Sequence, residues 1–122
     1  MAAKPSILIV DDEIDLGEIL ADYLESHFVT KVIANPVEAL QTIEKDRFDL
    51  IISDISMPLV DGFQILACVQ KAQPETPVIV LTGNALGDPL TQEALKRGAK
   101  GIITKPFSTP DDVIAYLKQF LR

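Results

Sequence analysis

The chain alternates between short apolar runs and longer stretches in which apolar residues return every three or four positions. The short runs predict buried strands, because a strand covered on both faces reads as continuous apolar sequence. The longer stretches predict amphipathic helices. Strand and helix therefore alternate five times, with strands expected at 7–10, 28–34, 50–53, 78–81 and 101–104.

Several of the expected helices carry start and stop signals. Asn35-Pro36 and Thr109-Pro110 each place a capping residue before a proline at the first helical position, and Gly98 closes the fourth helix. The expected inward stripes are Leu16, Ile19, Leu20, Tyr23 and Leu24 in the first helix, Leu90, Ala94 and Leu95 in the fourth, and Val113, Leu117, Phe120 and Leu121 in the last.

This alternation predicts an α/β fold with right-handed crossovers. We expect a doubly wound five-stranded parallel sheet with five helices, flavodoxin-like, in the strand order 2-1-3-4-5. No repeat, low-complexity tract or linker interrupts the pattern, so residues 1–122 are expected to form one domain.

Composition narrows the possible functions. Hydrophobic residues make up 48% and charged residues 24% of the chain, an ordinary globular balance. A net charge of −7 without any Lys/Arg run argues against direct nucleic-acid binding. Cys68 is the only cysteine, which excludes an internal disulfide and favours a reducing compartment. The short apolar run after the N-terminus suits neither a signal peptide nor a membrane span, so we expect a cytoplasmic protein without membrane contact.

Four of the apolar strands end in polar groups. Asp11 and Asp12 follow the first strand, Asp54 the third, Thr82 the fourth and Lys105 the fifth. Ligands of open parallel sheets bind outside the carboxyl ends of the strands, and the expected strand order brings these four ends together. Because an ionised carboxylate is costly to bury, we expect Asp54 just beyond the sheet edge, facing a positive group.

Three neighbouring carboxylates repel one another unless a cation lies between them. Oxygen ligands without His or Cys favour Mg²⁺, or Mn²⁺, with waters completing the octahedron. The ammonium of Lys105 and the hydroxyl of Thr82 add groups that suit a phosphoryl ligand, and a carboxylate can itself accept the phosphoryl group.

These residues resemble the receiver domain of two-component response regulators, and the resemblance covers essentially the whole chain. The motifs that carry it are 10–12 (Val-Asp-Asp), 53–62 (Ser-Asp-Ile-Ser-Met-Pro-Leu-Val-Asp-Gly), 81–83 (Leu-Thr-Gly) and 105–107 (Lys-Pro-Phe). They stand in the family's order and spacing.

The resemblance implies that Asp54 is phosphorylated from a phosphohistidine on a histidine kinase or phosphotransfer protein. It implies that Asp12 and Asp54 bind Mg²⁺ directly, Asp11 through water, and Ser56 through its backbone carbonyl. Thr82, beside Gly83, and Lys105 would hold the phosphoryl group, and the peptide bond before Pro106 would be cis. The resemblance also implies that phosphorylation changes the conformation of the domain and thereby controls an output partner of unknown identity. A homodimer that forms on phosphorylation is compatible with the resemblance.

One position departs from the family. The aromatic residue expected three positions before the lysine is Ile102 here, so we expect a weaker switch or another signal path. The family's signalling face comprises the fourth helix, last strand and last helix, where Tyr116 would lie. The acidic face of the first helix (Asp15, Glu18, Asp22, Glu25) is either solvated or meets the kinase.

Other interpretations remain open from sequence alone. Asp11 and Asp12 also suit the cap of the first helix, Lys105 a solvated position, and Thr82 a hydroxyl that satisfies a backbone group. His27 is expected at the surface and Cys68 as a buried apolar side chain, and neither Ser53 nor Ser56 has a histidine to activate it.

At the level of function, a haloacid-dehalogenase-type phosphatase and an unphosphorylated interaction domain are the alternatives. The chain is either a stand-alone regulator or a segment of a longer one. Ser56 and Asn84 are expected to tune the phosphoryl lifetime.

Overall fold

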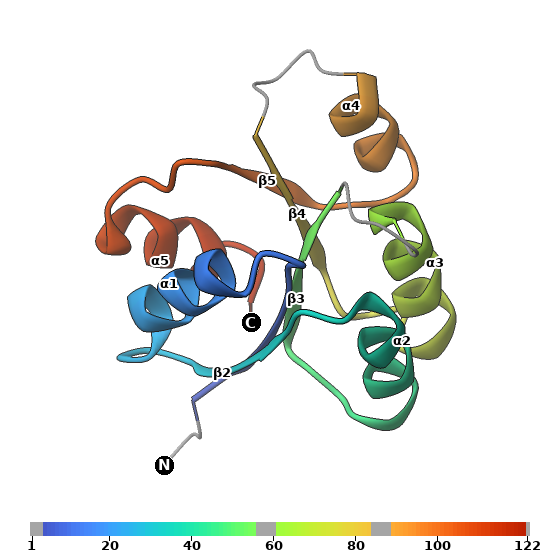
Figure 1. Ribbon diagram of the computed structural model, residues 1–122, viewed down its shortest axis with the longest axis horizontal. Coiled ribbons are helices and arrows are strands. Elements are labelled where there is room, and N and C mark those ends of the chain that lie inside the picture. Colours follow the sequence, from blue (N-terminus) through green and yellow to red (C-terminus); the bar gives the residue numbers. More distant parts are fainter. Residues whose placement is uncertain (1–3, 56–60, 84–88, 122) are drawn as a thin grey trace.

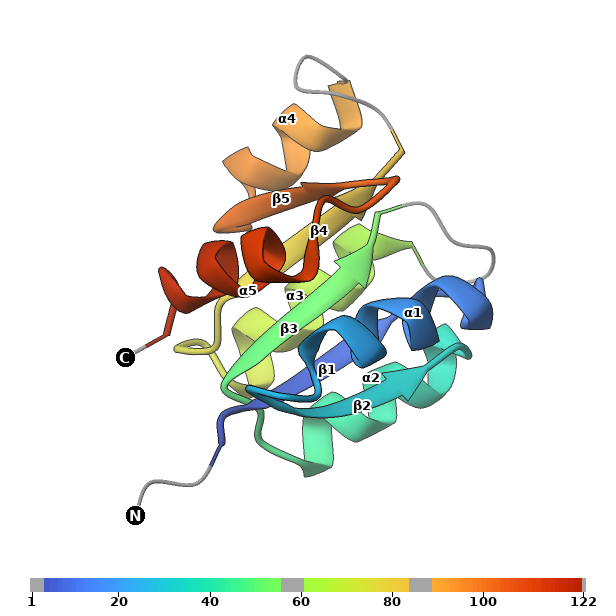
Figure 2. The same cartoon turned by 90° about the vertical axis from the view of Figure 1, so that its left-hand side faces the viewer.

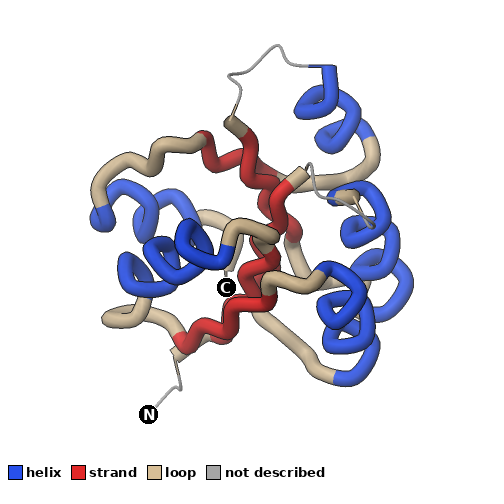
Figure 3. Tube along the Cα trace, in the orientation of Figure 1, coloured by secondary structure: helices blue, strands red, loops and turns tan. Residues whose placement is uncertain are grey.

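The computed structural model describes residues 4–55, 61–83 and 89–121, which form a parallel sheet with helices on both faces (Figure 1). The strands are β1 (Ser6–Val10), β2 (Val29–Ile33), β3 (Leu50–Asp54), β4 (Val78–Thr82) and β5 (Gly101–Thr104). The helices are α1 (Ile14–Leu24), α2 (Pro36–Lys45), α3 (Gly62–Ala72), α4 (Pro89–Lys96) and α5 (Pro110–Lys118). Strand and helix alternate along the chain as predicted (Figure 3).

The strand order is β2-β1-β3-β4-β5 and every pair is parallel, which confirms the predicted doubly wound topology (Figure 2). β3 is the central strand. Its register pairs Ser53 with Val10 of β1 and Asp54 with Leu81 of β4. The carboxyl ends of β1, β3 and β4 therefore meet at one edge of the sheet.

The sheet separates two layers of packed side chains. Figure 1 shows α1 and α5 on one face and α2, α3 and α4 on the other. Alternate residues of β1 enter the two layers: Ile7 and Ile9 pack on the α1–α5 side, whereas Leu8 and Val10 pack on the opposite side. All four are completely buried. Burial of such side chains stabilises the fold by roughly 2 kcal/mol each, which explains why the strand sequences are uninterruptedly apolar.

The helix caps are those that the sequence predicts. Asn35 Oδ1 accepts hydrogen bonds from the backbone N–H groups of Val37 and Glu38 at 2.9 and 3.3 Å. Thr109 Oγ1 accepts one from Asp112 N–H at 3.2 Å. Gly98, just after α4, has φ of 112°, a conformation that disfavours residues with a side chain.

Some expected core positions are wrong. Ile19 in α1 is 44% exposed and Leu90 in α4 is 47% exposed. In each helix a narrower stripe faces the sheet: Leu20 and Leu24 in α1, and Thr91 and Ala94 in α4. Phe120 and Leu121, expected within the last helix, follow its end at Lys118 and are only partly buried against the core. A single helix face contacts the sheet, so neighbouring apolar residues about 100° away remain in solvent.

Gln73 joins several segments at the edge of the sheet opposite the strand carboxyl ends. Its side chain is 1% exposed, and its Nε2 donates to the carbonyls of Ile43 and Asp46 at 2.9 and 2.7 Å. Its Oε1 accepts from Phe48 N–H at 3.1 Å and from the hydroxyl of Thr76 at 2.9 Å. The amide thus bonds to four polar groups that are buried or partly buried, and so connects α2, the start of β3 and the turn before β4.

In the described part of the chain, no helix combines the length and the apolar character needed to cross a membrane.

Candidate functional site

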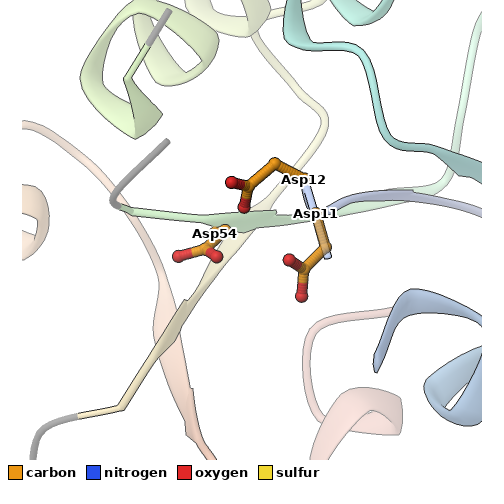
Figure 4. Close-up of side chains that lie close together, drawn as sticks. All are labelled: Asp11, Asp12 and Asp54. Atoms are coloured by element: carbon orange, nitrogen blue, oxygen red, sulfur yellow. The ribbon is translucent and has the colours of Figure 1, made fainter. Parts of the chain in front are cut away.

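Three carboxylates converge where β1 and β3 end. Asp11 and Asp12 follow β1 directly, and Asp54 is the last residue of β3. Oxygen atoms of the three side chains lie within 4.8 Å of one another. Figure 4 shows the side chains grouped at this edge, contributed by two adjacent strands. The predicted convergence of Asp11, Asp12 and Asp54 is therefore what the structure shows.

Asp54 lies deeper than expected. It remains within β3, because the N–H of the following residue, Ile55, still donates to the carbonyl of Leu81 at 3.1 Å. Only 7% of Asp54 is exposed, so the prediction that it sits beyond the sheet edge is wrong. A carboxylate at this depth needs a compensating positive charge.

Lys105 supplies that charge. It follows β5, and its backbone N–H donates to the carbonyl of Thr82 at 2.9 Å. Its ammonium donates a hydrogen bond of 3.1 Å to Asp54 Oδ2 and forms an ion pair of 3.1 Å with Asp11 Oδ2. The side chain is only 16% exposed, so it is not a solvated lysine. The peptide bond between Lys105 and Pro106 is cis, as predicted.

The charges of this cluster perturb one another. Burial raises the pKa of Asp11, although the N–H of Glu13 and the Lys105 ammonium oppose the increase. Burial alone would lower the pKa of Lys105, but its contacts with Asp11 and Asp54 outweigh that effect and raise the pKa. The lysine therefore stays charged throughout the physiological pH range, and Asp11 is the acid that is costly to ionise without a cation.

The donor set fits a hard divalent cation. Asp11 Oδ2 is buried and, among the described residues, has no hydrogen-bond partner beyond its ion pair with Lys105. Asp12 is exposed, which leaves its carboxylate open to an ion and to the waters around it. Carboxylate oxygens that gather at a partly open edge are suited to Mg²⁺ with several retained waters.

The cap interpretation of the two acids is not what the structure shows. Glu13 is the N-cap of α1 and makes no side-chain capping hydrogen bond. Asp11 Oδ1 does accept from the Glu13 N–H at 3.0 Å, which orients the Asp11 side chain, but its other oxygen turns toward Lys105.

Glu13 is also a residue that sequence reasoning missed. Its Oε1 lies 3.8 Å from Lys105 Nζ, at the exposed rim of the cluster. Its only sequence signal is its place directly after Asp12.

Gly62 permits the close packing of α3 behind the site. A Cβ at this position would lie 2.6 Å from Ile55 Cα and 2.7 Å from the carbonyl oxygen of Asp54. The N–H of Gly62 donates to the Ile55 carbonyl at 3.1 Å. Next to it, Asp61 and Gln64 form a reciprocal capping box that fixes the start of α3. Asp61 and Gly62 thus fix the start of α3 against the end of β3.

The remaining predicted residues fall into two groups. Thr82 ends β4 beside Asp54 and is 3% exposed, and Gly83 follows it at the surface. Ile102 is half-buried and packs against the core on the α2–α4 face. Ser56 and Asn84 lie outside the described residues, so their predicted roles stay predictions.

The other candidate groups do not join the site. His27 is exposed, as expected, with Nδ1 2.8 Å from the hydroxyl of Ser26. Ser53 is buried and donates to the backbone carbonyl of Asp54 at 3.0 Å, so it is not a nucleophile. Cys68 is half-buried, not fully buried as expected, and its thiol faces the carbonyl of Leu40 at 3.7 Å.

Comparison with known proteins agrees with this geometry. Residues 7–118 match the family described as the response regulator receiver domain. Over 117 residues the chain is 33% identical to the transcription factor SKN7 of Saccharomyces cerevisiae, covering 95% of this chain and 18% of that relative's length. The chain thus corresponds to a small part of that protein.

Solved structures show the same fold. The chemotaxis protein CheY4 of Vibrio cholerae has a TM-score of 0.86 and 33% identity, with 98% of this chain and 100% of that chain covered. The receiver domain of the sensor histidine kinase PA1611 of Pseudomonas aeruginosa, solved with a magnesium ion in its active site cleft, has a TM-score of 0.84 and 25% identity, with 97% and 98% covered. With its strand order, its acidic cluster and a match that spans nearly its whole length, the chain belongs to the response regulator receiver domain family of two-component systems.

Proposed function

We propose that Asp54 accepts a phosphoryl group from a phosphohistidine of a histidine kinase or phosphotransfer protein. Phosphorylation and Mg²⁺ are standard for this family. The observation that carries the assignment to Asp54 is the Lys105 ammonium, 3.1 Å from both Asp54 and Asp11, at the edge where the three carboxylates gather. A phosphoryl group added to Asp54 would meet a positive charge already in position.

In the proposed reaction, a carboxylate oxygen of Asp54 attacks the phosphorus atom. The bond between phosphorus and the imidazole nitrogen breaks, and its electron pair stays with the departing imidazole. The product is an acyl phosphate on Asp54, which water later hydrolyses to restore the carboxylate and release inorganic phosphate. Lys105 pairs with the phosphoryl oxygens, and the hydroxyl of Thr82, beside Gly83, donates to one of them.

Asp11, Asp12 and Asp54 would hold Mg²⁺, with the backbone carbonyl of Ser56 as a further ligand. When bound, the ion neutralises the acids and the phosphoryl oxygens. The magnesium ion in the active site cleft of the PA1611 receiver domain supports this assignment. Asp11 Oδ2 supports it from within the chain, because this buried oxygen has no partner among the described residues besides the Lys105 ammonium.

Receiver domains interact with sensor kinases, and the family is not one of classical enzymes. We therefore propose that residues 1–122 act as one cytoplasmic receiver domain that catalyses only its own phosphorylation and dephosphorylation. Its conformational change would control an output protein or domain, and a phosphorylation-dependent homodimer is one form that control could take.

Incubation with Mg²⁺ and acetyl phosphate, followed by intact-protein mass measurement, tests the proposal. The mass should rise by one phosphoryl group in the wild type and in Asp46→Asn, an exposed acid outside the site, and should not rise in Asp54→Asn. Continuous release of phosphate from varied phosphate esters would indicate a phosphatase of the haloacid-dehalogenase type instead. No mass change would indicate a domain that only binds other proteins.

A further inference from the structure

The side chain of Tyr116 reaches from α5 to the backbone of β5. Its hydroxyl oxygen accepts a hydrogen bond from the N–H of Ile102 at 2.9 Å. A Cβ at Gly101 would collide with this hydroxyl, so the glycine leaves the space that Tyr116 occupies. The ring also packs against Phe120, in an edge-to-face contact with centroids 5.2 Å apart. Three residues thus fix the tyrosine against one point of the strand.

That strand leads directly into the site. β5 has only four residues and continues into Lys105, three positions after Ile102. It lies at the edge of the sheet, where β4 is its strand neighbour. On the α5 side, the Tyr116 hydroxyl is hydrogen-bonded to the backbone of β5. A displacement of Lys105 along the strand direction therefore changes the geometry between Ile102 and Tyr116.

A hollow of about 260 Å³ lies beside this contact, between β5 and α5. Its lining includes Ile102, Thr104, Asp112 and Tyr116. Thr104 pairs in register with Thr82, the hydroxyl residue at the site. The hollow therefore has one wall on the strand that leads to Lys105 and the other on the helix that carries Tyr116.

We infer that the hydrogen bond between Tyr116 and Ile102 couples the state of Asp54 to the shape of this hollow. This inference rests on the proposed function. A phosphoryl group on Asp54 adds negative charge where Lys105 now contacts two carboxylates. The ammonium therefore moves from these carboxylates to the phosphoryl oxygens, and this movement displaces the end of β5. Through the hydrogen bond between Ile102 and Tyr116, the displacement of β5 changes the shape of the hollow between β5 and α5.

The coupling must act equally in both directions. The free energy by which phosphorylation weakens or strengthens the hydrogen bond equals the free energy by which the hydrogen bond disfavours or favours phosphorylation. Because one such hydrogen bond contributes modestly to stability, the effect is limited to roughly two- to tenfold in the phosphorylation equilibrium.

The chain offers a clean probe, because Tyr23 and Tyr116 are its two tyrosines. In a Tyr23→Phe background with 3-fluorotyrosine incorporated, a single ¹⁹F resonance reports on Tyr116. We expect that resonance to shift when Mg²⁺ and acetyl phosphate are added, and to stay unchanged in the same protein carrying Asp54→Asn. The intact mass of each sample is measured in parallel.

The outcomes separate the two proposals. A phosphorylated protein whose Tyr116 resonance does not move would overturn the coupling and leave the proposed function standing. A protein that gains no mass would overturn the proposed function, and the coupling with it.

A second measurement uses Tyr116→Phe, which removes only the hydroxyl. In ¹⁵N spectra, the Ile102 amide should respond to phosphorylation in the wild type and in Tyr23→Phe, and that response should be lost or reduced several-fold in Tyr116→Phe. An undiminished response in Tyr116→Phe, with phosphorylation verified by mass, would contradict the inference.

Discussion

Lys105 donates a hydrogen bond of 3.1 Å to Asp54 from a position 51 residues later in the sequence. The two side chains meet because β3 and β5 both flank β4 and end at the same edge of the sheet. The ammonium also faces Asp11 at 3.1 Å, so one cation compensates two buried acids. This arrangement leads to the first of five predictions.

Replacement of Lys105 by Met should destabilise the protein when no divalent ion is present, because Asp11 and Asp54 would remain buried without their cation. We expect a loss of about 1–3 kcal/mol in the free energy of unfolding, measured by urea denaturation. Mg²⁺ should bind this variant more tightly than the wild type, since a competing positive charge is gone. Lys100→Met, at an exposed position, is the control, and equal stability of the two variants would contradict the ion-pair argument.

Asp12→Asn should weaken Mg²⁺ binding without much loss of stability. Asp12 is exposed, so its removal breaks no buried contact, whereas a unit charge next to a divalent ion is worth at least about tenfold in affinity. Calorimetric titration with Mg²⁺ gives the affinity, and thermal unfolding gives the stability. Asp15→Asn, an exposed acid in the first turn of α1, should bind Mg²⁺ like the wild type. Unchanged affinity in Asp12→Asn would remove Asp12 from the metal site.

Gly62→Ala should be much more harmful than Gly83→Ala, although both glycines border the site. The new methyl group at 62 would press on backbone atoms at 2.6 and 2.7 Å, whereas no described residue lies within 4 Å of a Cβ at 83. We expect a loss of about 1–3 kcal/mol in unfolding free energy for Gly62→Ala and little change for Gly83→Ala. Urea denaturation of the pair decides the matter, and equal losses would mean that α3 does not pack as closely on Asp54 as described.

Gln73→Leu should cost about 3 kcal/mol of unfolding free energy, because a side chain of similar volume would remove the partner of the Phe48 N–H and of the carbonyls of Ile43 and Asp46. The Thr76 hydroxyl would keep its hydrogen bond to the Phe48 carbonyl. The same exchange at the exposed Gln41 should change stability little. Denaturation curves of both variants provide the test. If Gln73→Leu were neutral, ordered water would have to satisfy the freed carbonyls.

The Cys68 thiol should resist alkylation in the folded state. Burial raises its pKa above the ordinary thiol value of 9.0, Glu44 adds to the increase, and Lys71 opposes it. A raised folded-state pKa means that the unfolded chain ionises first as pH rises, so this group costs stability only above pH 9.0. Iodoacetamide should therefore react much more slowly with the folded protein at neutral pH than with the same protein in urea. Equal rates would show that the thiol is accessible and unperturbed.

Much of this architecture is predictable because two independent patterns agree. The apolar runs that end at Val10 and Ile52 place Asp11 and Asp54 after neighbouring strands, and the motif around Lys105 gives the third member of the cluster. Periodicity could not show that strand pairing includes Asp54 and is followed by the hydrogen bond from the Ile55 N–H to the Leu81 carbonyl, which keeps Asp54 buried. Nor could it exclude Leu90 from the core, because exposure on a short helix depends on which face meets the sheet.

Contacts between distant side chains were the least predictable features. The approach of Glu13 to Lys105 and the hydrogen bond from Ile102 to Tyr116 depend on rotamers and on the exact spacing of elements. The space left by Gly101 for Tyr116 is visible only after the strand and helix are placed together.

The division of the core into two layers has a consequence for how this domain can diversify. Apolar side chains of one layer are screened from those of the other by the backbone of the sheet, so substitutions in different layers should combine additively. Substitutions that change the helices on one face of the sheet, and the partner they bind, can therefore leave the helices on the other face unchanged. The acidic cluster and Lys105 lie at the carboxyl ends of the strands, between the two layers, so changes in either layer have to preserve their positions.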